Sequence, residues 1–368
     1  MSDGRDRDSI EFIQGLRGLA AAGVVLYHAR VFIDGGRYLD LGTRLFGSGG
    51  AGVDLFFVIS GFIMVHTTRQ LAGGPRDALA FLARRFARIW PVYAVAFASM
   101  WLFTRLLTGP QWQVSLEDLG KTLAFYPLEP RSTAPFFGYP LLHVGWTLVY
   151  EAFFYGVFAL ALVTRRWRYL VLAAMFLGYL VVWPLAATGD WHADAMRGYR
   201  LHGYAAIATN PIVWDFAFGV LVGLLRAVDL GRFTIRDRGV LGCFVALAVG
   251  AVLWQLFSGY RHGHGPTRWG APMAVMVLAL MLYDKQYPIR VPGWMRWLGD
   301  ISFSLYLFHV IPQMLPRAWK SEPQLTTGGG FFVASIVAGG VLAYISYRVL
   351  ERGVSEKLRR WLLARIRA

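Results

Sequence analysis

Two ionisable residues, Arg17 and His28, lie eleven positions apart in an apolar run that begins at Phe12. Ionisable side chains are costly inside a membrane and usually mark a working site there. Eleven positions are close to three helical turns, so both side chains project from nearly one face, about 16 Å apart. An imidazole suits removal of a proton from a hydroxyl at neutral pH. The pattern predicts a general base at His28; the alternative is a neutral histidine hydrogen-bonded to a neighbouring helix.

Asp54 opens the next apolar run, directly after the glycine-rich residues 49–53. Its predicted depth matches that of His28, so an Asp–His pair is geometrically feasible. A carboxylate in that place would hold the imidazole tautomer and stabilise the imidazolium formed on proton transfer. The alternative is that Asp54 complements the positive N-terminal end of its own helix.

Three arginines, Arg84, Arg85 and Arg88, lie just before Trp90 in a segment predicted to face the cytoplasm. Arginine binds phosphate oxygens bidentately, which favours a phosphorylated cytoplasmic substrate such as coenzyme A. The alternative is the ordinary excess of basic residues in cytoplasmic segments. Arg17 lies deeper in the chain's first run, where that excess is no explanation.

Two further ionisable residues lie inside apolar runs. Glu151 either forms a structural ion pair, for example with Arg17, or has a catalytic or orienting role. His309 is expected to contact substrate or to bond to the backbone. Tyr27, beside His28, and Trp146, beside the Glu151 segment, are our other candidates for substrate contact.

The remaining histidines and the single cysteine carry weaker signals. His262 and His264 form an H-x-H pair on a glycine-rich loop, but no third ligand is in sight, so we expect no metal site. His66 and His143 lie near the ends of apolar runs and are interpreted as interfacial residues. Cys243 cannot form a disulfide within the chain and is interpreted as a small apolar residue.

The composition indicates a polytopic membrane protein. Of 368 residues, 56% are hydrophobic and only 16% are charged, which is more apolar surface than a soluble domain could bury. The net charge of +15 is attributed to topology rather than to nucleic acid, because no exposed basic tract interleaved with aromatics occurs.

We predict an all-α transmembrane bundle of about ten spans. With the N-terminus inside, the cytoplasmic segments hold 24 Lys and Arg residues and the outer segments 12, which favours N-in and C-in. The basic, amphipathic residues 356–365 are expected to lie on the inner leaflet. The predicted spans are 12–33, 51–68, 90–108, 143–164, 169–187, 210–228, 239–258, 270–283, 298–316 and 328–350.

Together these segments resemble the membrane-bound acyltransferase 3 family, most closely its exopolysaccharide-modifying type. The motifs are Arg17-x10-His28, the run Gly52–Phe62, Arg85-x-x-Arg88, the run Trp146–Tyr155 and Ser304-Leu305-Tyr306-Leu307-x-His309. The resemblance implies a catalytic His28 and functional roles for Arg17, Asp54, Arg85, Arg88 and Glu151. It also implies an acyl-CoA donor that binds from the cytoplasm and an acceptor on the far side.

From the residues and the resemblance we expect one transmembrane domain over residues 1–368, without an additional esterase-like domain. Its expected activity is transfer of an acyl group, with acetyl as the favoured case, from acyl-CoA to a sugar hydroxyl of an exopolysaccharide, lipopolysaccharide or lipid-linked glycan. The expected location is the bacterial inner membrane, with no tightly bound cofactor. The rivals are a transporter or flippase for a lipid-linked sugar or acyl donor, and a structural subunit of an export complex.

Overall fold

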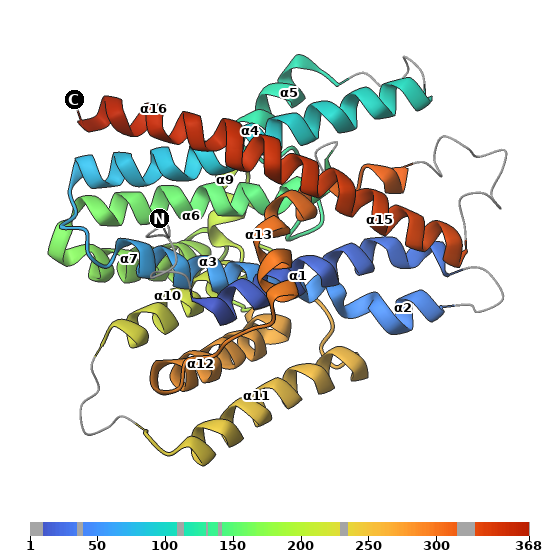
Figure 1. Cartoon of the computed structure of the whole chain (residues 1–368). Coiled ribbons are helices and arrows are strands. Elements are labelled where there is room, and N and C mark those ends of the chain that lie inside the picture. The colour runs from blue at the N-terminus through green and yellow to red at the C-terminus, as the bar shows by residue number, and fades with distance from the viewer. Residues whose placement is uncertain are drawn as a thin grey trace, which may run out of the picture.

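The fold is helical throughout the part of the chain that the structure, a computed structural model, describes: residues 10–34, 40–108, 114–129, 132–138, 142–228, 235–314 and 328–367 (Figure 1). This confirms the predicted all-α class. The helices are α1 (Glu11–Ala29), α2 (Leu41–Phe46), α3 (Gly52–Thr68), α4 (Pro75–Thr108), α5 (Leu116–Leu123), α6 (Trp146–Val163), α7 (Arg168–Leu177), α8 (Trp183–Thr188), α9 (Tyr204–Thr209), α10 (Val213–Ala227), α11 (Arg238–Ser258), α12 (Ala271–Gln286), α13 (Gly293–Phe308), α15 (Gly329–Ser346) and α16 (Glu356–Arg367).

Six helical stretches in the described residues are long and apolar enough to cross a membrane. They coincide with six of the ten predicted spans. Helices α1, α10, α12 and α13 cover the other four predicted spans but are not among these six. The six stretches are Leu41–Thr68, Pro75–Leu107, His143–Val163, Arg165–Thr188, Arg238–Ser258 and Gly329–Ile366.

Glycines allow the central helices to pack closely. Helix α3 lies against α10, and α1 lies against α13. A Cβ atom at Gly219 would lie 1.9 Å from the carbonyl oxygen of Val58, and one at Gly18 would lie 2.9 Å from the backbone nitrogen of Gly299. Small residues let membrane helices approach until their backbones touch. These close contacts hold α1, which carries Arg17 and His28, and α3, which carries Asp54, tightly against their neighbours.

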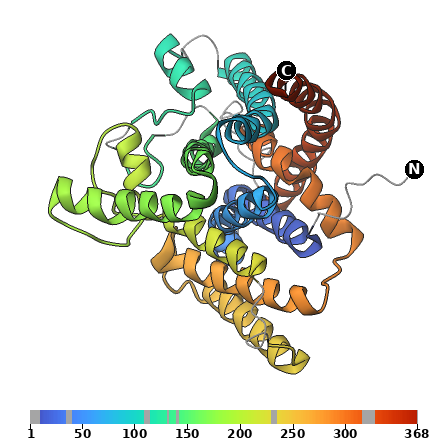
Figure 2. The same ribbon diagram turned by 90° about the vertical axis from the view of Figure 1, so that its left-hand side faces the viewer.

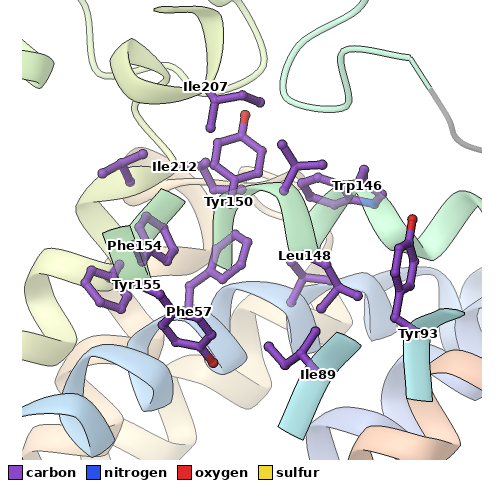
Figure 3. Packing of buried hydrophobic residues seen from close by; sticks show 14 of the residues in the cluster. Phe57, Ile89, Tyr93, Trp146, Leu148, Tyr150, Phe154, Tyr155, Ile207 and Ile212 are labelled. Atoms are coloured by element: carbon purple, nitrogen blue, oxygen red, sulfur yellow. The ribbon is translucent and has the colours of Figure 1, made fainter. Parts of the chain in front are cut away.

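Aromatic side chains fill the space between α3, α6 and α10. Figure 3 shows Phe57, Tyr150 and Phe154 gathered on one side of α6, where Phe57 and Phe154 pack edge to face with ring centroids 5.4 Å apart. Phe154 in turn stacks on Phe216 of α10 at 4.0 Å. These rings are almost completely buried, so they fix α6, and with it Glu151, relative to α3.

The last helices form one continuous stretch. A π-helical segment, Tyr347–Ser355, joins α15 to α16, and α16 packs along α4. Figure 1 shows this stretch in red beside α4, and Figure 2 shows the same neighbours from another direction. Residues 356–365 thus continue a long apolar helix and lie beside α4 rather than forming a separate surface helix, and their side chains are half-buried or exposed. Their place on the inner leaflet stays a prediction.

Candidate functional site

Two adjoining cavities lie around the predicted arginines. We call the first the inner cavity; together with the open space at its mouth it spans about 690 Å³, and Arg17, Arg85, Arg88 and Glu151 are among its lining residues. We call the second the arginine vestibule; its volume is about 1040 Å³, and it shares Arg17, Arg85 and Arg88 with the inner cavity and adds Arg84. The structure thus brings together four arginines from α1 and α4 that the sequence only suggested were related.

Uncharged groups and rings hold these arginines in place. Arg17 donates hydrogen bonds to Gln14 Oε1 at 3.0 Å and to Ser302 Oγ at 3.1 Å. The guanidinium of Arg85 lies 5.3 Å from the ring centre of Phe81 and donates to Thr67 Oγ1 at 3.3 Å. None of these contacts is an ion pair, although the carboxylates of Glu151, Glu351 and Asp300 interact electrostatically with Arg17. The guanidinium groups of Arg17 and Arg85 can therefore still interact with an anionic ligand.

Glu151 lies on α6 and faces the inner cavity. It accepts hydrogen bonds from the hydroxyls of Tyr155 and, at 3.4 Å, of Ser60. In the described residues its hydrogen-bond partners are hydroxyl groups, so the direct ion pair with Arg17 considered above is not formed. Its carboxylate instead adds a negative charge to the wall of a cavity that contains several arginines.

A tyrosine closes the far end of the inner cavity. The hydroxyl of Tyr306 lies 2.8 Å from Thr147 Oγ1 and 3.0 Å from the carbonyl oxygen of Val144. Tyr306 and Thr147 both line the cavity, whereas His28 does not. The Tyr306 ring centre is 6.3 Å from that of His309. Tyr306 therefore borders the inner cavity on one side and the histidines on the other. Tyr306 belongs to the motif that ends at His309, but the sequence alone indicated no role for it.

Three histidines meet beyond Tyr306. His28 Nδ1 lies 3.1 Å from His309 Nε2 and 3.1 Å from the carbonyl oxygen of Val24. His309 Nδ1 lies 3.0 Å from the carbonyl oxygen of Leu305, and the ring of His143 packs 5.0 Å from that of His28. The interpretation of His143 as an interfacial residue missed this contact. It lies in a short 3₁₀ turn, and nothing in its local sequence indicates which helix that turn meets.

These distances specify one self-consistent set of neutral tautomers. His309 donates its Nδ1–H to the Leu305 carbonyl, which leaves a lone pair on Nε2. That lone pair accepts a hydrogen bond from the Nδ1–H of His28. The same N–H is shared with a second acceptor, the Val24 carbonyl oxygen. The remaining nitrogen of His28, Nε2, then carries a lone pair. This is the arrangement that a general base requires.

Asp54 does not contact His28. It is fully buried and accepts hydrogen bonds at 2.7 Å from both His264 Nδ1 and the backbone N–H of Gly265. The predicted pairing of Asp54 with His28 is wrong, because the loop after α11 folds over the start of α3 and supplies a different histidine. Asp54 also lies in the first turn of α3, where its charge complements the positive end of that helix, as the alternative interpretation held.

The loop that holds His264 is also tied to the loop between α8 and α9. Arg268 donates hydrogen bonds to both carboxylate oxygens of Asp194, at 3.3 and 3.2 Å. Partial burial acts to raise the pKa of Asp194, but the hydrogen bonds from Arg268 and from the Met196 backbone outweigh it, so the pKa lies below its ordinary value. His262 lies 3.2 Å from the Gly47 carbonyl, so the H-x-H pair is used for two separate contacts.

The last two candidates, Tyr27 and Trp146, lie on different sides of this region. The Tyr27 ring packs edge-on against His28 at 5.1 Å, and the Arg30 guanidinium stacks over it at 3.8 Å. Trp146 is 7% exposed and its ring centre is 5.5 Å from that of His264. Of the two, Tyr27 contacts the histidine cluster directly.

Among the described residues no group of three or more His, Cys, Asp or Glu side chains is placed to hold a metal ion.

A family model described as an acyltransferase domain matches residues 10–348. The chain belongs to the acyltransferase 3 family. It is similar to the exopolysaccharide production protein ExoZ of Rhizobium meliloti, with 29% identity over 83% of this chain and 89% of ExoZ. It is also similar to the putative membrane-bound transacylase BcsY of Komagataeibacter xylinus, with 30% identity over 81% of this chain and 71% of BcsY.

A more distant relative is the peptidoglycan O-acetyltransferase OatA of Listeria monocytogenes, with 22% identity over 94% of this chain and 56% of OatA. No solved structure matches the chain. Family membership confirms the resemblance drawn from the motifs, and with the six apolar stretches it identifies a multi-pass membrane protein of the acyltransferase class.

Proposed function

We propose that the chain transfers an acyl group, acetyl in the favoured case, from cytoplasmic acyl-CoA to a sugar hydroxyl of an extracytoplasmic glycan. The proposal rests on one observed arrangement: the arginine vestibule adjoins the inner cavity, Tyr306 lines that cavity, and the histidine cluster lies beside Tyr306. The names of relatives, an exopolysaccharide production protein and a peptidoglycan O-acetyltransferase, support a glycan acceptor. The location that fits is a bacterial inner membrane.

The arginines would bind the donor. Coenzyme A carries several phosphate groups, and Arg84, Arg85 and Arg88 present guanidinium groups to one cavity in which those phosphates could be bound. Arg17 is common to both cavities, so it would lie beside the pantetheine arm as the arm enters the inner cavity. Phe56, Phe57 and Ile59 line that cavity and suit an uncharged arm.

His28 would act on the acceptor. Its Nε2 would take the proton from the sugar hydroxyl while the hydroxyl oxygen attacks the thioester carbonyl. A C–O ester bond forms, the C–S bond breaks, and the coenzyme A thiolate leaves and recovers the proton from the imidazolium. The thioester must pass the Tyr306 ring to reach His28, so the side chain has to swing away from Thr147 during each cycle.

The test uses the full chain purified in lipid nanodiscs with acetyl-CoA and a soluble glycan acceptor. We expect free coenzyme A to appear only when the acceptor is present, and mass spectrometry to detect an acetylated glycan. A transporter or flippase would move a ligand across a vesicle membrane without releasing coenzyme A. Mass spectrometry of surface glycans from cells with and without the protein would then identify the acyl group directly.

A further inference from the structure

The C-terminal helix forms part of the arginine vestibule. Sequence reasoning assigned this segment only a place on the membrane surface. Four of its residues line the vestibule together with the arginines of α4: Glu351, Ser355, Glu356 and Arg359. The π-helical segment Tyr347–Ser355 lies in the same place, and such segments are frequent at functional sites because they shift side chains relative to a regular helix.

The vestibule carries an excess of positive charge. Five arginines line it against three carboxylates. Asp300 accepts a hydrogen bond from Gln14 at 2.6 Å and Glu351 accepts one from the backbone N–H of Ser304 at 3.2 Å, and both carboxylates offset part of the charge of Arg17. The third, Glu356, faces an arginine of its own helix. The charge balance suits a ligand with several negative charges.

Arg359 is the vestibule arginine that the C-terminal helix supplies. Its Nη2 lies 2.6 Å from Glu356 Oε1, three residues earlier, and its side chain is 43% exposed. A half-exposed pair of this kind contributes little to stability. The Nε of Arg359 is buried and has no hydrogen-bond partner in the described part of the chain. The buried Nε is out of a ligand's reach, but the guanidinium lines the vestibule and its side chain is 43% exposed, so a ligand there can contact its outer N–H groups.

We infer that Arg359 is a further donor-binding residue, which binds a phosphate group at the nucleotide end of acyl-CoA. Glu356 competes with that phosphate for the guanidinium. The inference rests on the proposed function, since it takes the donor to be acyl-CoA. The vestibule is the right part of the site for the nucleotide end, because the inner cavity continues from it to Tyr306 and leaves room there for the arm and the thioester.

The experiment measures kcat and the KM for acetyl-CoA with the full chain and three variants. Arg359→Ala should raise KM about tenfold through loss of a hydrogen bond to a charged group, with little change in kcat. Glu356→Gln should lower KM, because it removes the competing carboxylate. Arg360→Ala is the matched control: the same charge lies one position away on an exposed face, and KM should stay unchanged.

Two further measurements separate binding from folding. Arg359→Lys should recover part of the affinity, and the melting temperature of each variant without ligand should match that of the wild type. Removing the 3′-phosphate from the donor would show which phosphate is bound: the penalty of Arg359→Ala disappears only if Arg359 binds that group. If the penalty persists, the pyrophosphate is the bound group.

The inference is overturned if Arg359→Ala leaves KM unchanged while the wild type uses acetyl-CoA. It is also overturned if Arg359→Ala and Glu356→Gln both raise KM and lower the melting temperature, because the pair then serves only to hold α16. Failure of the wild type to bind or turn over acetyl-CoA is a different result. That result refutes the proposed function as well as this inference.

Discussion

The arginine-lined cavities and the histidine cluster differ in how their ionisable side chains are paired. At the inner end, Arg17 and Arg85 remain charged at any relevant pH and are held by neutral partners and rings. At the other end, His28 and His309 bond to each other and to backbone carbonyls, and no carboxylate of the described residues is among their hydrogen-bond partners. Under the proposed function, the contrast means that permanent charge lies where the anionic donor would bind and an uncharged base lies where the proton would be taken.

Asp54 belongs to neither end, although the sequence suggested the outer one. Its carboxylate accepts hydrogen bonds from His264 and from the backbone N–H of Gly265. It therefore secures the loop between α11 and α12 to the start of α3. The following substitutions test this division between binding, chemistry and support.

The largest effect is expected from His28→Ala. Loss of a general base typically costs about 10²- to 10⁴-fold in rate. We expect kcat for acceptor-dependent coenzyme A release to fall by that amount, while acetyl-CoA binding measured by calorimetry is retained. His262→Ala removes a histidine from an outer loop and serves as the control. Turnover by His28→Ala at the wild-type rate would refute a catalytic role for His28.

A smaller loss is expected from His309→Phe. His309 is fully buried and contacts His28 rather than open space, so we treat it as a positioning residue. His309→Phe removes one of the two acceptors of the His28 Nδ1–H and leaves the Val24 carbonyl, so the preferred tautomer is weakened by about 0.5–1.5 kcal/mol, or about twofold to tenfold in kcat. The pH profile of kcat should shift as well. His309→Gln offers an amide oxygen to the same N–H and should recover part of the rate; equal rates for both variants would contradict this role.

Asp54→Ala should act mainly on stability. It leaves the Gly265 N–H and the His264 ring without their buried partner, and each unpaired group costs about 1–3 kcal/mol. We expect a lower melting temperature, with His264→Ala as the matched variant that should lower it similarly. If Asp54→Ala instead abolishes turnover at an unchanged melting temperature, Asp54 takes part in the chemistry, as the family resemblance implies.

The smallest effect is expected from Tyr306→Phe, which keeps the ring but removes its hydroxyl. The lost hydrogen bonds to Thr147 and Val144 are worth about 0.5–1.5 kcal/mol each. The Tyr306 side chain should move away from Thr147 more often, so hydrolysis of acetyl-CoA without acceptor, which is not expected in the wild type, should become detectable. Thr147→Val removes one of these bonds from the other side and should have a similar effect. Unchanged hydrolysis in both variants would show that Tyr306 is not the barrier.

Much of the helical architecture could be predicted because it depends on composition. Runs of apolar residues of spanning length must be helical in lipid, since only helices and closed barrels satisfy their backbone groups there. Six of the predicted spans correspond to helices of the required length and apolarity. The pairing of Arg17 and His28 on one helix was likewise readable, because a helix has a fixed period and both residues belong to α1.

Contacts between helices far apart in the sequence could not be predicted. Asp54 was assigned to the wrong histidine, since His264 is 210 positions away and only the return of the α11–α12 loop brings it close. His309 reaches His28 across 281 positions. Local periodicity carries no information on which helix faces which, so the partner of a buried polar group stays open until the packing is known.

The sequence by itself determined that this chain is a helical membrane protein and that Arg17 and His28 occupy one helix at different depths, because helix geometry and the cost of polar groups in lipid are local properties. Only the tertiary structure decided that Tyr306 stands between the arginines and the histidines, that Asp54 supports a loop, and that Arg359 joins the vestibule. These facts depend on close packing of helices through glycine contacts, and close packing is a property of the whole bundle.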